Sequence, residues 1–414
     1  MPRVLISSST FPLQRNDGLP RFVYDLAEAL SDWCEVTALV PAAPGVQQRE
    51  QFGRVAVYRF PYFIPRSWQK LAYGHGMHNN VRASWLARAQ LLPFLLQQIK
   101  ATGHLVRHES IELINSHWMI PQGLSSAIAS LFMRRVPHVL SVHAADIYLL
   151  RRLIGGTQLA RFIFRHSDAV FSDGSHVRDT LDQILREPSH GVLQPMGVHL
   201  NLFHQIHDLP PQDVHYPDGY LVCIGRFVEK KGIRYLLQAL PQVLNRYPQL
   251  GLILIGYGAL EHKLRQEAVQ LGVAQAVNFV GRKSHADISR YLRGSRVAVV
   301  PSIIDQYGET EGMPTVVIEA MAAGARVVGS AVDGIPDVIR HGENGWLCRE
   351  KDATDLAEKI LQALADPPST AIISDARETA LHFDWSCVAE RYWQTFTRLL
   401  GTNSTPHEQT EMAS

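Results

Sequence analysis

The chain has 414 residues, of which 46% are hydrophobic, so it is long enough for two or three globular domains. Its 40 Lys and Arg residues against 39 Asp and Glu residues leave a formal net charge of +1, which gives no reason to expect a nucleic-acid partner. Four scattered cysteines and the lack of any run near about 18 apolar residues exclude a disulfide framework, a zinc knuckle and a membrane span. We therefore expect a reduced, cytoplasmic protein.

The N-terminal half combines a strand–helix pattern with an excess of positive charge. An apolar run at Val4–Ser8 precedes an amphipathic stretch at Arg21–Leu30, which predicts a strand and then a helix. That apolar run is too short for the core of a signal peptide. Residues 66–165 hold 12 basic and 3 acidic residues, interleaved with aromatic residues. This stretch is either a surface for anionic lipid, which would place the protein on the inner face of a membrane, or an ordinary solvated face.

A polar, Pro-rich stretch near residues 209–219 indicates a boundary between two domains, 1–209 and 220–384. After it, apolar runs end in small residues, which is typical of parallel strands whose carboxyl ends bind a ligand. These runs are Tyr220–Gly225, Leu252–Gly256, Val277–Gly281, Val297–Ser302 and Ala325–Ser330. A final helix is predicted at 385–402, and the pattern-free residues 403–414 are predicted to be a disordered tail.

The most informative segment follows residue 310. Pro314 suits the first turn of a helix, whose amides at Thr315 and Val316 can bind a phosphate. Glu319 lies about one turn further, and its carboxylate leans back toward the helix start, where a ribose diol is its natural partner. Glu311 precedes the helix in a loop and can accept hydrogen bonds from sugar hydroxyls. The segment therefore predicts a site for a sugar nucleotide.

Glu311 and Glu319, eight residues apart, resemble the Glu-x7-Glu motif of retaining glycosyltransferases of family four, which have the two-domain GT-B fold. Arg226, and Lys231 five residues later, are similar to the Gly-Arg and Lys-Gly signature of that family, in which both cations hold the donor diphosphate. Two fixed cations there neutralise the charge that develops on the departing nucleotide. The resemblance implies catalytic roles for Arg226, Lys231 and Glu311.

The same resemblance extends to the first half. His143 and Asp146 resemble a Thr-x-His-Gly-x-Asp loop, with Ala144 in place of the glycine. The resemblance implies a catalytic role for His143, which is expected to reach the donor hexose near the reacting carbon. A core histidine that orients the loop is the alternative. Gly18 stands in the loop after the first strand, where its amide would bind phosphate, and Gly256 is expected to make room for the base. The expected donor-binding set is Gly18, Asp146, Arg226, Lys231, Gly256, Glu311, Gly312, Met313, Thr315, Val316 and Glu319.

These observations predict an α/β protein of GT-B class, with two Rossmann-like, doubly wound parallel-sheet domains facing across a cleft. The resemblance implies that residues 1–209 bind the acceptor, that 220–384 bind the nucleotide sugar, and that the helix at 385–402 crosses back to the first domain. The expected function is transfer of a hexose, with retention, from a nucleotide-diphosphate sugar to a glycan or lipid-linked acceptor in the biosynthesis of cell-surface polysaccharide.

We expect no metal and no other cofactor, because the sequence has neither an Asp-x-Asp triplet nor a His-x-x-x-His pair with an adjacent Glu. A phosphate oxygen of the donor, rather than a side chain, is expected to take the acceptor proton. Two alternatives stay open: a nucleotide-sugar epimerase of the same fold and a non-catalytic binder of sugar nucleotides. A dehydrogenase fits least, since no complete G-x-G-x-x-G follows a strand.

Overall fold

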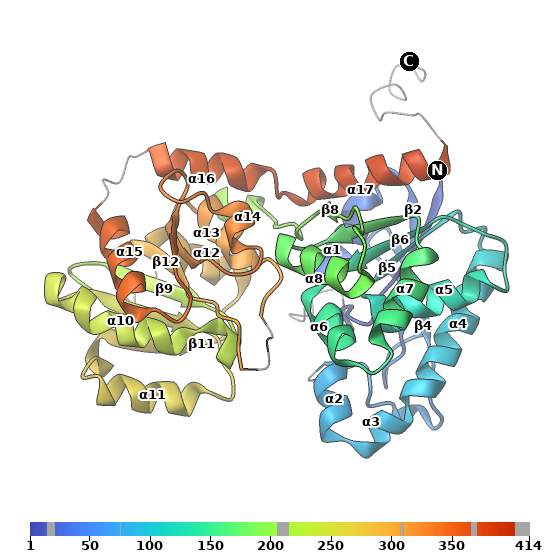
Figure 1. Cartoon of the computed structure of the whole chain (residues 1–414), viewed down its shortest axis with the longest axis horizontal. Helices are drawn as coiled ribbons and strands as arrows, with labels where there is room; N and C mark the ends of the chain where they lie inside the picture. Colours follow the sequence, from blue (N-terminus) through green and yellow to red (C-terminus); the bar gives the residue numbers. More distant parts are fainter. Residues whose placement is uncertain are drawn as a thin grey trace, which may run out of the picture. The chain divides into compact units, whose positions relative to one another are not determined.

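The computed structural model describes residues 1–14, 21–74, 76–204, 215–306, 308, 310–365 and 371–401. The chain forms two compact units, each built on a largely parallel sheet (Figure 1). Of the described residues, the first unit holds those within 1–173, 177–197 and 385–401, and the second holds those within 174–176 and 198–384. Residues 209–214 of the predicted boundary and the whole predicted tail, 403–414, lie outside the described residues.

The sheet of the first unit has eight strands in the order β3-β4-β2-β1-β5-β6-β7-β8. All neighbouring strands are parallel except the edge strand β3, which runs antiparallel to β4. The strands are β1 Arg3–Ser7, β2 Glu35–Pro41, β3 Arg49–Phe52, β4 Val55–Phe60, β5 Leu113–His117, β6 His138–Val142, β7 Ala169–Ser172 and β8 Val192–Leu193.

Helices cover both faces of this sheet, so that β1, near its centre, has three consecutive apolar residues, Val4–Ile6. In β1, Val4 and Ile6 pack in one core cluster while Leu5 packs in another, as the alternation of side chains along a strand requires. The helices are α1 Phe22–Leu30, α2 Met77–Ala83, α3 Trp85–Ala89, α4 Leu91–His108, α5 Leu124–Ser130, α6 Ala144–Arg152, α7 Gly156–Arg165, α8 Ser175–Leu185 and α17 Trp385–Leu400.

The second unit has six strands in the order β11-β10-β9-β12-β13-β14, all parallel. Numbered within the unit, this is the order 3-2-1-4-5-6 of a dinucleotide-binding fold. The strands are β9 Tyr220–Ile224, β10 Gly251–Ile255, β11 Val277–Gly281, β12 Val297–Val300, β13 Arg326–Ser330 and β14 Trp346–Cys348. The prediction of two doubly wound α/β units is confirmed.

Two hydrophobic clusters fill the two faces of the second sheet. Helices α10 and α15 contribute to one, and α12, α13 and α16 to the other. The helices are α9 Asn201–His204, α10 Ile233–Arg246, α11 Glu261–Gln270, α12 His285–Gly294, α13 Thr315–Ala322, α14 Ile335–Val338, α15 Ala353–Ala365 and α16 Ala371–Leu381. Helix α13 is apolar almost throughout because it is buried between sheet and neighbouring helices.

Helix α17 returns the chain to the first unit. Its buried residues Trp385, Tyr392 and Phe396 join the same core cluster as the inward face of α1. The Tyr392 ring stacks on Phe171 with centroids 4.1 Å apart, and its hydroxyl lies 3.0 Å from the Ser141 hydroxyl. The C-terminal helix is therefore an integral part of the first core.

Candidate functional site

The loops that follow β9, β10 and β12 lie at the carboxyl edge of the second sheet. β9 and β12 are neighbours, and the strand order reverses between them, which is where open α/β sheets bind ligands. Gly225 and Arg226 follow β9, Gly256 follows β10, and Pro301 follows β12. The topology thus brings predicted site residues that are far apart in sequence to one edge.

Two glycines allow these loops to approach one another closely. Gly232 has φ +63°, and a Cβ there would lie 1.8 Å from the carbonyl oxygen of Pro301. Gly256 has φ +144°, and a Cβ there would lie 1.9 Å from the carbonyl oxygen of Gly225. Both positions therefore require glycine. Gly256 also lines the hollow described below, and its expected role in making room for a base stays a prediction.

A buried carboxylate bridges two lysines at this edge. The Nζ atoms of Lys230 and Lys231 each lie 3.2 Å from a different carboxylate oxygen of Glu311, and the exposed fractions of the three side chains are 22%, 15% and 16%. Burial raises the pKa of Glu311, but Lys231 and then Lys230 outweigh it and lower that pKa to about 2. Glu311 is therefore ionised and oriented at neutral pH. The sequence pattern had identified Lys231 but not Lys230.

Helix α13 begins at Thr315, and Pro314, which was predicted to lie in the first turn, is its N-cap with extended backbone. Its first amides precede the first helical backbone hydrogen bond and are available to an anion. The Thr315 hydroxyl donates to a carboxylate oxygen of Glu319 at 3.4 Å, and burial raises the pKa of Glu319. Lys231 and His285 act on that pKa in the opposite direction. Lys231 thus interacts electrostatically with both glutamates.

The loop before α13 is held by a second glycine-containing segment. The amide of Gly334 donates to the carbonyl oxygen of Gly312 at 3.2 Å. A Cβ at Gly334 would lie 3.1 Å from that oxygen and 3.1 Å from the Cβ of Met313, which is itself buried. These contacts fix the path of the chain between Glu311 and the start of α13.

The side chain of Arg226 borders a hollow of about 200 Å³ at the ends of β9, β10 and β11. Apolar walls come from Ile255 and Ile288. Tyr257 also lines it, with the guanidinium of Arg282 4.9 Å from the centroid of the tyrosine ring. A flat aromatic group with an attached anion would match these walls and Arg226. Arg282 is a lining residue that no sequence motif marked.

In the first unit, His143 stands at the end of β6 as the N-cap of α6. Its Nδ1 atom lies 3.2 Å from a carboxylate oxygen of Asp173, and its Nε2 atom lies 3.2 Å from Nδ1 of His117. The two imidazole rings are stacked, with centroids 5.5 Å apart. His117 and Asp173 end β5 and follow β7, so the parallel strands align all three side chains. Sequence reasoning missed both partners, although each comes directly at a strand end.

Burial sets the protonation of this cluster. It lowers the pKa of His117 well below the ordinary value, and His143 lowers it further, so His117 is neutral. Burial raises the pKa of Asp146 to about 7, against the opposing effect of His143 and of backbone amides. The carboxylate of Asp146 accepts hydrogen bonds from the amides of His143, at 3.2 Å, and of Met119. Asp146 therefore ties the start of α6 to the loop after β5.

One predicted residue, Gly18, lies outside the described residues. Among the residues that the structure describes, no three His, Cys, Asp or Glu side chains are grouped so that they could hold a metal ion. The predicted residues of the second unit surround the edge of one sheet, whereas His143 and Asp146 belong to the first unit.

Both halves of the chain match known protein families. Residues 17–197 match the family described as glycosyl transferase 4-like domain, and residues 211–379 match glycosyl transferases group 1. An uncharacterized glycosyltransferase of Methanocaldococcus jannaschii is 26% identical over 78% of this chain and 85% of its own length. A putative colanic acid biosynthesis glycosyltransferase of Salmonella typhimurium is 27% identical over 57% of this chain and 58% of its own. An amylovoran biosynthesis glycosyltransferase of Erwinia amylovora is 34% identical over 34% of this chain and 35% of its own.

Solved structures share the architecture. Sucrose-phosphate synthase from Thermosynechococcus elongatus matches with a TM-score of 0.72 and 21% identity, covering 97% of this chain and 100% of that one. The Anabaena protein HepE, crystallised in complex with UDP and glucose, matches with a TM-score of 0.68 and 19% identity, covering 96% and 100%. At these identities the similarity establishes the fold alone.

Proposed function

We propose that this chain, a glycosyltransferase of GT-B type, transfers a hexose from a nucleotide-diphosphate sugar with retention of configuration. Its first half matches a glycosyl transferase 4-like domain, and its second half matches glycosyl transferases group 1. The observation that carries the proposal is the arrangement of Lys230, Lys231 and Glu311 beside the loop that leads to α13. It supplies fixed positive charge and an oriented acceptor of hydrogen bonds in one place.

Binding of the donor diphosphate follows from the charges at this edge. Lys231 and Arg226 offer cationic donors, and the first amides of α13 offer neutral ones. The ion pair between Lys231 and Glu311 does not use all three N–H groups of the lysine, so a phosphate oxygen can bind to the same ammonium. These groups are aimed where negative charge accumulates as the bond to the sugar breaks. We propose that they make the reaction independent of a metal.

The two glutamates have different roles in the proposal. Glu319, with its hydrogen bond from Thr315, accepts hydrogen bonds from the ribose hydroxyls near the diphosphate. Glu311 is ionised between two lysines and accepts from hydroxyls of the hexose. His143 retains the role in the reaction that the family resemblance implies. A phosphate oxygen of the donor takes the acceptor proton, so no side chain acts as general base.

The acceptor in this proposal is a growing glycan or a lipid-linked sugar of a cell-surface polysaccharide. Support comes from the relatives whose names place them in colanic acid and amylovoran biosynthesis. No general feature of the fold selects an acceptor, because GT-B structures with quite different names align with this chain at similar TM-scores, 0.72 and 0.68.

Thermal unfolding of the full chain with a panel of nucleoside diphosphates and nucleotide sugars tests the donor site. A ligand at 100 times its Kd stabilises by about 2.7 kcal/mol, which raises the unfolding temperature by a few degrees. Lys231→Met and Glu319→Ala should abolish that shift, whereas Lys263→Met on α11 should leave it unchanged. A panel that shifts nothing, or a Lys231→Met variant that responds as the wild type does, contradicts the proposed site.

The stereochemistry is tested with the nucleotide sugar that gives the largest shift. Proton NMR of the glycoside formed should show the same anomeric configuration as the donor, and a chelator should not change the initial rate. An inverted product would overturn the retaining mechanism. Conversion of the donor to an isomer without any acceptor would favour the epimerase alternative.

A further inference from the structure

Helix α4 of the first unit presents two faces to different surroundings. Its inner face, with Phe94, Ala101 and Leu105, is buried in a core cluster. Its outer face carries Leu92 and Leu96, whose exposed fractions are 64% and 49%. At about 100° per residue, an arc of roughly 100° on this outer face holds leucines at 92 and 96 and further residues at 99, 100, 103 and 107. An apolar stripe that no part of the described chain covers needs another explanation than core packing.

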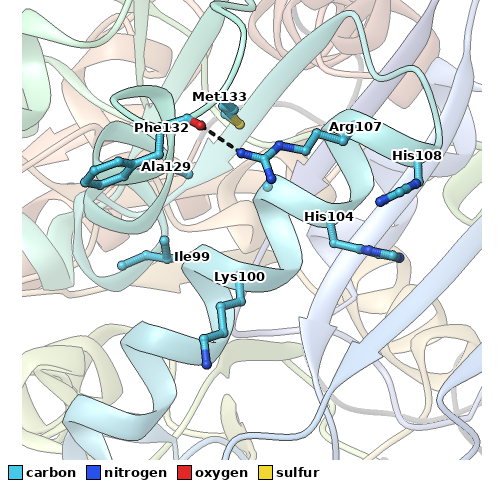
Figure 2. Close-up of a pocket in the computed structure, with 9 residues that line it drawn as sticks. Ile99, Lys100, His104, Arg107, His108, Ala129, Phe132 and Met133 are labelled. Atoms are coloured by element: carbon cyan, nitrogen blue, oxygen red, sulfur yellow. Dashed lines mark hydrogen bonds between the residues drawn. The ribbon is translucent and has the colours of Figure 1, made fainter.

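The stripe continues into a groove toward α5. Gly103 leaves a gap on the outer face, and the groove, of about 290 Å³, runs between α4 and the turn after α5. Phe132, with an exposed fraction of 72%, lies on the far side of the groove (Figure 2). Arg107 holds that turn, because its guanidinium donates to the carbonyl oxygen of Phe132 at 2.8 Å. The groove is thus a fixed feature of the first unit.

Cations accompany the exposed apolar side chains. Lys100 and Arg107 line the groove together with His104 and His108. Figure 2 shows the side chain of Lys100 extending away from the helix. Residues 64–108 contain no Asp or Glu at all. The two acidic residues that follow are engaged elsewhere, since Glu109 pairs with Arg49 at 3.2 Å and Glu112 accepts from the amide of Arg3 at 2.9 Å.

The flanking segments also expose large apolar side chains. Of the seventeen such side chains that are exposed in the described residues, eight lie between residues 64 and 132. Gln90, the N-cap of α4, accepts from the amide of Lys70 at 3.0 Å and donates to the carbonyl oxygen of Trp68 at 2.7 Å. The loop with the half-exposed Trp68 is therefore anchored to the start of α4. Trp85, in α3, is exposed to 76%.

We propose that the α4 face, defined as Leu92, Leu96, Lys100, Arg107 and Phe132, docks the protein on an anionic lipid bilayer. The leucines and Phe132 enter the boundary between headgroups and acyl chains, and the cations bind headgroup phosphates. Among the described residues, no helix combines the length and the apolar character that crossing a bilayer requires. The proposed contact lies at the surface of the bilayer and depends on both burial of apolar surface and charge.

A bilayer fits this face better than an acidic protein. Exposed Leu, Trp and Phe side chains next to Lys and Arg are the composition of interfacial helices, and the aromatic rings suit the headgroup level. An acidic protein would be recognised by the cations but would leave the apolar stripe uncovered. The proposal does not depend on the donor site, because α4 and that site lie in different units.

Co-sedimentation of the full chain with vesicles tests the proposal. Vesicles of phosphatidylcholine with about one-third phosphatidylglycerol should bind the protein at low ionic strength. Vesicles of pure phosphatidylcholine should bind it at least tenfold more weakly. Salt should weaken binding to the anionic vesicles, because exposed charges are screened over about 10 Å at 0.1 M. Absence of binding to the anionic vesicles at low salt overturns the proposal. Equal binding to both vesicle types overturns its electrostatic part.

Matched variants localise the contact. Lys100→Glu should weaken vesicle binding at least about fivefold, because each cation near such a surface contributes roughly 1 kcal/mol. The double variant Leu92→Gln with Leu96→Gln should weaken vesicle binding by a similar factor, because it removes apolar surface from the contact. The controls lie on α11 of the second unit: Lys263→Glu for the charge and Val269→Gln, whose side chain is exposed to 67%, for the apolar change. The controls should bind as the wild type does.

Two readouts separate this result from a folding defect or another partner. Each variant should keep the wild-type unfolding temperature and the wild-type response to nucleotides. If the α11 controls lose binding as strongly as the α4 variants, or if soluble polyglutamate competes fully with the vesicles while the leucine variants bind normally, the α4 face is not a lipid surface.

Discussion

At the scale of single residues, the second unit concentrates charge around one carboxylate. Glu311 lies between Lys230 and Lys231, and its side chain is only 16% exposed. A buried carboxylate without these partners would strongly destabilise the fold, so the two lysines allow an ionised acceptor of hydrogen bonds at this position. The same lysines also position positive charge where we propose that a diphosphate binds.

Glu311 should give the fold a measurable pH dependence. Its folded pKa of about 2 lies below the ordinary value of 4.5, so the ion pairs stabilise the folded state fully above pH 4.5 and lose that contribution as the pH falls from 4.5 toward 2. We expect Glu311→Gln to lower the free energy of unfolding at pH 7 by about 2 kcal/mol and the difference from the wild type to shrink in acid. Denaturant titrations at several pH values measure it.

The matched control for that experiment is Glu343→Gln, since Glu343 is 64% exposed and pairs with Arg340 on the surface. Its removal should change the free energy of unfolding by less than about 1 kcal/mol. If the two variants have the same pH dependence, Glu311 is not held ionised by the lysines.

Asp173 is the second residue with a testable consequence. By accepting the Nδ1 proton of His143 it fixes the tautomer of that ring and directs Nε2 toward His117. Asp173→Asn should lower kcat about tenfold or more while leaving KM for the donor nearly unchanged, because it acts through His143. Steady-state kinetics across pH 6–9 would show the change, with the exposed Asp179→Asn as control. Equal loss in both variants, or a change in KM alone, argues against a positioning role.

At the scale of elements, the connections after the strands decide the site. The turn from β9 to α10 passes through Gly232, whose φ of +63° and contact with Pro301 leave no room for a side chain. This turn places Lys231 opposite the loop after β12. The start of α13 is fixed in the same way by the contact of Gly334 with Gly312 and Met313. Glycines therefore position the polar groups, although they carry no chemistry themselves.

Replacement of Gly232 tests this arrangement. Gly232→Ala combines a left-handed backbone, which costs about 1 kcal/mol, with a collision against a backbone oxygen, so the free energy of unfolding should fall by about 3 kcal/mol or more. Gly272→Ala is the matched control, because Gly272 also has a positive φ, +71°, but nothing lies within 4 Å of its added Cβ. Equal losses in both variants would show that backbone conformation alone matters at position 232.

At the scale of the whole molecule, the chain order of the two units is interleaved. The first unit is completed only by α17, which follows the entire second unit in sequence. Its residues Trp385, Val388, Tyr392 and Phe396 are buried with the residues of α1 and of the central strands. Folding of the first unit therefore needs a segment from the far end of the chain, whereas the second unit needs none of it.

Removal of residues 385–414 should destabilise the first unit and leave the second unit folded. Calorimetry should show that an unfolding transition assigned to the first unit is lost or greatly lowered, because several large buried side chains, each contributing about 3–5 kcal/mol, are absent. A second transition should persist and should still respond to a nucleoside diphosphate. Loss of both transitions would mean that the second unit depends on α17 as well.

Much of the fold could be predicted from the sequence. The apolar runs that end in small residues correspond to β9 to β13, and the amphipathic stretch at Arg21–Leu30 corresponds to α1. Such patterns are local, because strand and helix periodicity depends on residues within one element. For the same reason the start of α13 at Thr315 was predicted from Pro314.

The candidate site could be predicted only in part. Arg226, Lys231, Glu311 and Glu319 stand out by spacing and resemblance, and the structure brings their loops to one sheet edge. Two other residues of the site, Lys230 and Arg282, have no such spacing or resemblance to mark them. Lys230 is a second lysine beside a motif, and its pairing with Glu311 spans 81 positions. Arg282 enters the site because β11 lies beside β10.

The sequence by itself determined several strands and helices, such as β9 to β13 and α1, and it predicted which amides and which acidic and basic residues would bind a sugar nucleotide. Only the tertiary structure decided that His117, His143 and Asp173 align across three strands, that α17 completes the first core, and that α4 leaves an apolar and basic face exposed. The physical reason is that periodicity and motif spacing are properties of neighbouring residues, whereas pairing across strands and burial against distant helices depend on the order in which crossovers place the strands.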